Sequence, residues 1–187
     1  MSVSMPPRSL SPISGESPLH RYLGVAAIAA AIDLLTKEAA VRSLGEYGLY
    51  TLTDWFSLTV VWNLGAAGGT VVGPFVWLLN VVVSVLALGL VLSVVRPMAA
   101  VDPRSTVALG LVSGGALGNL ASIVAGPKGV ADFLAVRLTQ NVTMVANVAD
   151  LFLWSGALML IPVAITVLRM ARAERGAKGV PARARMA

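Results

Sequence analysis

The sequence contains no cysteine and a single histidine, His20, among its 187 residues. The absence of cysteine excludes a disulfide framework, a thiolate metal site and a cysteine nucleophile. One histidine, without a second histidine or a nearby carboxylate, supplies neither a zinc site nor a Ser-His-Asp arrangement. We therefore expect no metal and no cofactor, and we interpret His20 as a solvated residue that precedes the first apolar segment.

Charged residues are also scarce. Only 12% of the residues are charged, whereas 57% are hydrophobic and the mean hydropathy is +0.82. This composition is typical of integral membrane proteins and argues against a soluble core. The formal net charge is +5, but the basic residues stand beside apolar segments and are not interleaved with aromatic residues. We therefore expect no nucleic-acid partner.

Four long apolar segments are present, at residues 21–40, 71–95, 105–124 and 145–168. Each approaches or exceeds the ~20 residues that a membrane-spanning helix needs. Residues 47–62 mix β-branched and aromatic residues with polar ones, which favours short strands, whereas we interpret residues 125–144 as a polar connection. The predicted fold is an all-α membrane protein with four transmembrane helices and a small extracytoplasmic β-rich segment between helices 1 and 2.

The two ends of the chain differ from the middle. Residues 1–19 are rich in serine and proline, which predicts a disordered cytoplasmic tail, and residues 171–187 form a basic cytoplasmic tail. Residues 20–170 make up the four-helix membrane domain. The first apolar segment is long and lies far into the chain, so we expect it to be retained as a helix and not removed as a signal peptide.

The distribution of basic residues predicts the topology. Four spans place both termini on one side, and most lysines and arginines would share that side: Arg8, Arg21, Arg96, Arg104, Arg169, Arg172, Arg175, Lys178, Arg183 and Arg185. The positive-inside rule then places both termini in the cytoplasm. We expect a multi-pass protein of the inner (cytoplasmic) membrane.

This topology gathers nearly all of the notable polar residues of the apolar segments and their connections toward the outer leaflet, with Asn80 as the exception. They are Asp33, Lys37, Asn63, Asn119, Asp132, Asn147 and Asp150. Asp33 and Lys37 are four residues apart, so they share a helical face and can form an ion pair. Polar and ionisable residues are expensive inside a membrane, so their convergence predicts one shared site near the outer leaflet. Glycines 110, 114 and 118, spaced by four, predict close helix packing beside it.

Two of these residues, Asp132 and Asp150, suggest a reaction. Two carboxylates in a partly dry site tend to share one proton, which leaves one as a base and the other as an acid. Such a pair suits hydrolysis of a peptide bond by an activated water molecule. A proton relay or an ion site stays open as an alternative.

Five ordered segments of the sequence resemble signal peptidase II, the lipoprotein signal peptidase, a membrane aspartyl protease of bacteria. They are DLLTK at residues 33–37, NLGAA at 63–67, GGALGN at 114–119, VADF at 130–133 and NVAD at 147–150. The resemblance implies that residues 20–170 form a peptidase domain and that Asp132 and Asp150 are the catalytic pair. By the same resemblance, the residues that support the site or bind substrate are Asp33, Lys37, Asn63, Gly65, Asn119 and Asn147.

The resemblance also implies a substrate, namely prolipoproteins that carry a diacylglyceryl group, from which the signal peptide is removed. We expect membrane lipids as the surroundings and a monomeric protein. The chain departs from the family where Ser122 and Ile123 replace an Asp-Arg pair, where Gly68 replaces an aromatic residue, and at Ala146. The alternatives are a non-catalytic family member that binds a lipidated peptide or a membrane partner, and a small proton-coupled carrier, although no internal repeat is visible.

Overall fold

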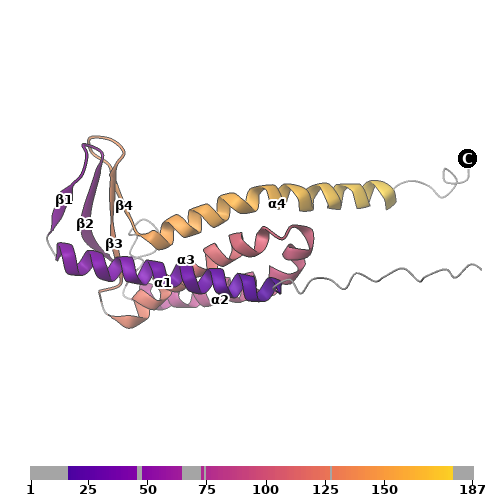
Figure 1. Ribbon diagram of the computed structural model, residues 1–187, viewed down its shortest axis with the longest axis horizontal. Helices are drawn as coiled ribbons and strands as arrows, with labels where there is room; N and C mark the ends of the chain where they lie inside the picture. Colours follow the sequence, from indigo (N-terminus) through magenta and orange to yellow (C-terminus); the bar gives the residue numbers. More distant parts are fainter. Residues whose placement is uncertain (1–16, 46–47, 65–72, 74, 127, 179–187) are drawn as a thin grey trace, which may run out of the picture.

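The computed structural model describes residues 17–45, 48–64, 73, 75–126 and 128–178. In chain order the elements are α1 (Pro18–Leu44), β1 (Leu49–Thr51), β2 (Phe56–Asn63), α2 (Val76–Val101), α3 (Ser105–Ala125), β3 (Val130–Arg137), β4 (Thr143–Ala146) and α4 (Val148–Lys178). The helices run alongside one another, and the sheet stands at one end of them (Figure 1). The predicted tails are residues 1–19 and 171–187. Residues 1–16 and 179–187 of these tails, and Gly65 and Gly68, lie outside the described residues, whereas α1 begins at Pro18 and α4 extends to Lys178.

Three helices in the described part of the chain are long and apolar enough to cross a membrane. They are Val76–Val101, Ser105–Ala125 and Val148–Ala173. Large apolar side chains on their surfaces are exposed, such as Leu86, Leu90 and Trp154 at 68–69%, as lipid-facing residues would be. The protein is therefore an integral membrane protein by composition and length of its helices. Helix α1 is equally long but carries Arg21, Asp33, Lys37, Glu38 and Arg42.

The helix boundaries differ from the predicted ones at several ends. Helix α2 continues through Pro97 to Val101, whereas the prediction ended it at residue 95. A proline near the end of a helix removes few hydrogen bonds, and residues beyond it bury apolar surface: Ala99 is 9% exposed, and Met98 packs on the core of Tyr22, Val95 and Leu109. The burial of these residues outweighs the loss of the backbone hydrogen bond at Pro97.

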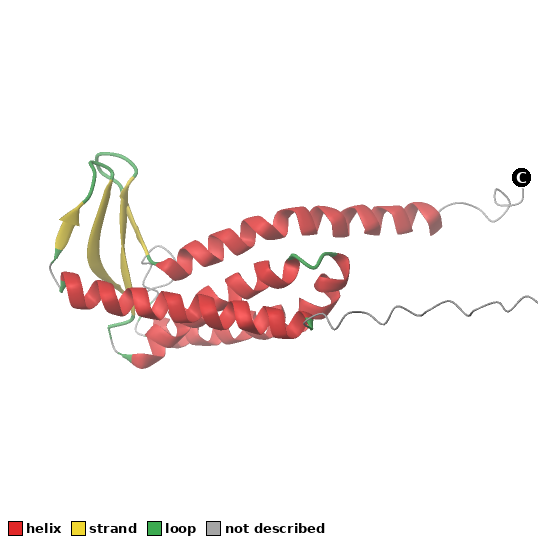
Figure 2. Cartoon of the chain, in the orientation of Figure 1, coloured by secondary structure: helices red, strands yellow, loops and turns green. Residues whose placement is uncertain are grey.

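The four strands form one antiparallel sheet in the order β1-β2-β3-β4. The predicted strands within residues 47–62 are present. The interpretation of residues 125–144 as a polar connection is wrong, because β3 and β4 lie there. Strand β3 pairs with β2, from Asn63 opposite Val130 to Phe56 opposite Val136. The sheet, shown in yellow in Figure 2, is therefore assembled from both sides of the α2–α3 hairpin.

Helix α3 packs between α1 and α4 through small residues. A Cβ atom on Gly114 would lie 2.5 Å from Ala29 Cβ, and one on Gly118 would overlap the Asp33 carboxylate. On the other side, a Cβ atom on Gly115 would lie 2.5 Å from the Ala149 carbonyl oxygen. The predicted close packing of this ridge is confirmed. It brings the Asp33 region of α1 and the start of α4 against the same part of α3.

Candidate active site

The Asp33–Lys37 pair lies on the face of α1 that meets α3. Lys37 Nζ donates to Asp33 Oδ2 at 2.6 Å, which confirms the predicted ion pair, and the two side chains are 0% and 6% exposed. The same ammonium donates to Asn119 Oδ1, also at 2.6 Å. The charge of Lys37 is thus shared between an acid on its own helix and an amide on α3.

Asn119 carries the connection from α1 to Asp150. Its Nδ2 donates to Asp150 Oδ1 at 3.2 Å while its Oδ1 accepts from Lys37. Since lysine can only donate, the Lys37 ammonium fixes the orientation of the amide: oxygen toward the lysine and nitrogen toward the carboxylate. Asn119 therefore lies near the end of α3 with both of its polar groups engaged.

The start of α4 positions Asp150. Asn147 Oδ1 accepts from the Asp150 backbone N–H at 3.1 Å, and Asp150 Oδ2 accepts from the Asn147 backbone N–H at 3.0 Å. This is a reciprocal capping arrangement, which satisfies donors that a helix start leaves without an intrahelical partner. Asp33 Oδ1 takes a third such donor, the Ala149 N–H, at 2.8 Å. Sequence reasoning missed this last contact, because no local pattern links residues 33 and 149.

Asp132 lies on β3, opposite Val61 of β2, and is 6% exposed. Asn147 Nδ2 donates to Asp132 Oδ1 at 2.6 Å and Asn63 Nδ2 donates to Asp132 Oδ2 at 3.0 Å. Burial raises the pKa of the Asp132 carboxyl above its ordinary value. The hydrogen bonds from Asn147 and Asn63 oppose this rise in pKa, and the negative charge of Asp150 adds to it.

These contacts join the predicted polar residues into one continuous network. It runs in the order Asp33, Lys37, Asn119, Asp150, Asn147, Asp132 and Asn63. The network lies where the helices meet the sheet, since α1, α3, α4, β2 and β3 all contribute to it. The predicted convergence is confirmed for each of these residues, whereas Gly65 lies in a part of the chain that the structure does not describe. Asn147 is its centre, because its side chain contacts both Asp132 and Asp150.

Within the described residues, no three His, Cys, Asp or Glu side chains are grouped so that they could hold a metal ion. The chemistry available is that of two carboxylates linked through one residue, Asn147, whose side-chain Nδ2 donates to Asp132 and whose backbone N–H donates to Asp150. Such a pair can take a proton from water on one side and give a proton on the other.

An apolar pocket of about 370 Å³ is lined by Leu64, Trp77, Ile123, Gly126 and Gly129. Ile123, one of the two departures from the expected Asp-Arg pair, is thus in apolar surroundings. The other departure, Ser122, donates from its Oγ to the Gly118 carbonyl oxygen at 3.0 Å within α3. Within the described residues, neither side chain forms a hydrogen bond to the polar network, so the contacts of that network form without the charged pair.

Comparisons with known proteins agree on one family. A family model described as signal peptidase (SPase) II matches residues 25–166. The lipoprotein signal peptidase of Rhizorhabdus wittichii is 38% identical over 157 residues, which cover 80% of this chain and 89% of that protein. The one of Rhodococcus jostii is 34% identical over 183 residues, with coverages of 94% and 85%.

The solved structures support the same architecture. A bacterial membrane enzyme matches with a TM-score of 0.66 and 22% identity, over 77% of this chain and 87% of that chain. A second solved bacterial membrane enzyme gives the same TM-score over 76% and 91%. At this level of identity the match shows a shared fold.

Proposed function

The chain belongs to the signal peptidase II family, and we propose that it is an aspartic endopeptidase that removes the signal peptide from diacylglyceryl-modified prolipoproteins. One observation carries the proposal. Asp132 and Asp150, from separate elements, both accept hydrogen bonds from Asn147: its Nδ2 donates to Asp132 Oδ1 and its backbone N–H donates to Asp150 Oδ2. A carboxylate pair held in this way, with Asp132 buried and Asp150 partly exposed, has the groups that peptide hydrolysis needs.

The two carboxyls take different roles. Asp150 is the base: it accepts a proton from a water molecule whose oxygen attacks the carbonyl carbon of the scissile bond. Asp132 is the acid, because burial raises the pKa of its carboxyl, and it gives its proton to the carbonyl oxygen. The tetrahedral intermediate then collapses: the C–N bond breaks as Asp150 gives its proton to the leaving amine, and Asp132 takes back the proton of one hydroxyl as the new carboxyl group forms. Both carboxyls are restored at the end of the cycle.

Four further residues position this pair. Lys37 fixes the amide of Asn119, which in turn donates to Asp150. Asp33 accepts from the backbone of α4 at Ala149, one residue before Asp150. These contacts hold the start of α4 against α1 and α3, so Asp33, Lys37 and Asn119 are positioning residues. Asn63 holds Asp132 from the sheet side.

Helix α1 completes a four-helix membrane domain over residues 20–170. What supports this is its length of 27 residues and its close packing on α3, which turns Asp33 and Lys37 inward. Both termini lie in the cytoplasm of a bacterial cell and the site lies near the outer leaflet of the inner membrane. Reporter fusions at Ala99 and Lys128 test the orientation: a cytoplasmic signal at Ala99 and an external one at Lys128 are expected, and the reverse contradicts it.

The protein acts as a monomer with lipid-modified prolipoproteins as its substrates. A single chain supplies every residue of the described polar network, so a partner subunit is not needed to build it. The pocket around Ile123 is apolar, as a lipid-modified substrate would require.

A second candidate function is binding of a lipidated peptide without cleavage. The observation that favours it is the loss of the charged pair at Ser122 and Ile123, which the resemblance associates with substrate positioning. The intact contacts of Asp132 and Asp150 favour catalysis.

One assay separates the two functions. Purified protein in detergent is incubated with a lipid-modified prolipoprotein, and the released signal peptide is measured. Asp132→Asn and Asp150→Asn each remove a proton-transfer group at nearly constant volume, so each is expected to lower turnover by ~10²–10⁴-fold. Asp54→Asn, at an exposed carboxylate of the sheet, is the matched control. Binding without product from the wild type would show the second function, and full turnover by either network mutant would exclude the pair.

A further inference from the structure

Strand β4 has a free edge beside the active site. It pairs with β3 on one side and is the last strand of the sheet, so its other edge has no partner among the described residues. Figure 1 shows β4 at the side of the sheet from which the chain enters α4. The strand, TMVA, contains none of the charged residues or prolines that commonly protect a sheet edge from pairing. Thr143 and Met144 are exposed.

The backbone groups on this free edge belong to Thr143 and Val145. Leu138 N donates to Val142 O at 2.9 Å across the β3–β4 turn. Hydrogen-bonded pairs alternate along an antiparallel ladder, so Met144 and Ala146 also bond toward β3, and the residues between them point outward. The backbone of Arg137, which lies opposite Thr143, is consistent with this register. Its N–H donates to Trp55 O on the other side of β3, away from β4.

This edge leads directly into the active site. Asn147 follows β4 and contacts both aspartates, and Val145 lies two residues before it, which is roughly 7 Å along a strand. A signal peptide is apolar and belongs among the membrane helices, whereas β4 stands beyond their ends (Figure 1). The part of a substrate that reaches β4 is therefore the part that follows the cleaved bond.

We infer that the polypeptide segment following the cleaved bond binds as an extended strand along the free edge of β4, hydrogen-bonded to the backbones of Thr143 and Val145. The inference rests on the proposed function. The substrate segment leaves the active site away from the helices, and β4 runs toward them, so the added strand is antiparallel to β4. Addition of a strand to a sheet edge is a general mode of peptide binding in which backbone contacts supply the affinity.

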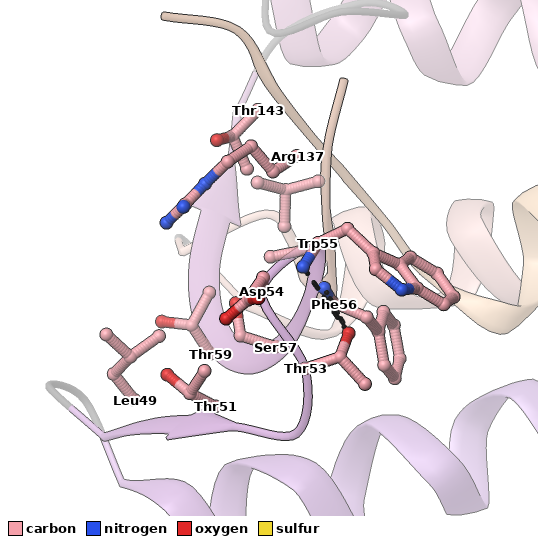
Figure 3. Close-up of a pocket in the computed structure, with 12 residues that line it drawn as sticks. Leu49, Thr51, Thr53, Asp54, Trp55, Phe56, Ser57, Thr59, Arg137 and Thr143 are labelled. Atoms are coloured by element: carbon pink, nitrogen blue, oxygen red, sulfur yellow. Dashed lines mark hydrogen bonds between the residues drawn. The ribbon is translucent and has the colours of Figure 1, made fainter. Parts of the chain in front are cut away.

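The side chains near this edge suggest a charge preference. Arg137 and Thr143 lie next to each other on one side of a pocket of about 230 Å³, and Leu49 lies on its other side (Figure 3). Arg137 has no carboxylate partner among the described residues. An acidic side chain on the face of the added strand that turns toward Arg137 would be attracted to it.

The test compares two lipid-modified substrates, one ending two residues after the cleaved bond and one extending eight residues beyond it. Val145→Pro removes an outward N–H, which an edge strand tolerates. It is expected to lower kcat/KM for the long substrate relative to the short one by roughly fivefold to tenfold, the loss expected for one backbone hydrogen bond. The matched control is Thr51→Pro on β1. Leu52 N donates to Phe56 O, so the Thr51 N–H points outward at the opposite edge of the sheet. In Thr51→Pro, the ratio of kcat/KM for the long substrate to kcat/KM for the short one should equal that of the wild type.

A measurement on the wild type keeps the inference testable if Val145→Pro does not fold. In this measurement each long substrate carries one N-methylated peptide bond, at a different position in each substrate. Cleavage should be slowed by methylation at alternate positions and unaffected by methylation at the positions between them. The absence of a two-residue period, or an equal Val145→Pro effect on both substrates, overturns the docking of the segment on β4. A dimer that Val145→Pro dissociates also overturns it, because a second copy would then occupy the edge. If the wild type cuts neither substrate, the proposed function fails instead.

Discussion

Helix α1 carries two ion pairs with the same spacing in opposite surroundings. Lys37 Nζ lies 2.6 Å from Asp33 Oδ2, with side chains 6% and 0% exposed. Arg42 Nε lies 2.5 Å from Glu38 Oε1, with side chains 77% and 58% exposed. An exposed pair contributes little, because water solvates each charge on its own. A buried pair is different, because loss of one partner leaves an uncompensated charge in the protein.

The two pairs also differ in what lies beyond them. The buried pair bonds to α3 through Asn119 and to α4 through the Ala149 N–H. The exposed pair, within the described residues, has only its own i,i+4 contact on α1. The spacing in the sequence produces both pairs, but burial and cross-helix hydrogen bonds make only the first one part of the active site.

The largest expected difference comes from removing the cation of each pair. Lys37→Met leaves the Asp33 carboxylate buried without its counter-charge and should lower the free energy of unfolding by about 3–5 kcal/mol. Arg42→Met, the matched change in the exposed pair, should cost no more than ~0.5 kcal/mol. Thermal melting of both variants in the same detergent measures the difference.

A double variant checks the cause. Asp33→Asn together with Lys37→Met removes both charges, so it should recover much of the stability that Lys37→Met loses. Turnover should stay low in both variants, because Asn119 Oδ1 no longer accepts the hydrogen bond from Lys37 that orients its amide. Equal losses of stability for Lys37→Met and Arg42→Met would show that burial does not distinguish the two pairs.

A smaller effect is expected from adding one methyl group beside the buried pair. A Cβ atom on Gly118 would overlap the Asp33 carboxylate, whereas one on Gly24 of α1 would meet nothing within 4 Å. Gly118→Ala should therefore destabilise the protein by about 1–3 kcal/mol and lower turnover. Gly24→Ala should stabilise α1 by about 0.5–1 kcal/mol, since alanine favours helix. A Gly118→Ala protein with wild-type melting and turnover would contradict the close contact.

The helices were predictable because a membrane imposes a length and a composition on each span. The strands β3 and β4 were not, because their pairing depends on distant partners. Val130 pairs with Asn63, and residues 130–137 form an apolar run interrupted by one aspartate, without the alternation that marks a half-buried strand. Only the pairing with β2 shows that Asp132 is on a strand.

It was predictable from the sequence that the polar residues form one site, but the contacts between them were not predictable. Placing charges in a membrane is expensive, so the shared side of Asp33, Asn119 and Asp150 already indicated a site. The spacing of Asn147 and Asp150 before an apolar run also fits a capping arrangement, which the structure contains. The bond from Ala149 to Asp33 joins residues 116 positions apart, and its formation depends on how closely α3 lets α1 and α4 approach.

The smallest effect is expected at the sheet side of the site, as a change in pH dependence. Burial raises the pKa of Asp132, and the hydrogen bond from Asn63 Nδ2 at 3.0 Å opposes that rise. Asn63→Ala removes the bond, so the pKa of Asp132 should rise further. In the proposed mechanism Asp132 acts in its protonated form, so activity should be lost as the pH rises through its pKa. The alkaline limb of the kcat/KM profile should therefore move to higher pH.

The direction of that movement decides between the two assignments of acid and base. If Asp132 were the base, activity would require its ionised form, and the same rise in pKa would move the acidic limb upward instead. Asp54→Asn, which neutralises an exposed carboxylate of the same sheet outside the polar network, should leave both limbs in place. Melting temperatures of the wild type and both variants show whether the fold is retained. A profile in which Asn63→Ala shifts neither limb would mean that Asp132 does not titrate in the pH range of activity, and the proton would have to be assigned to another group.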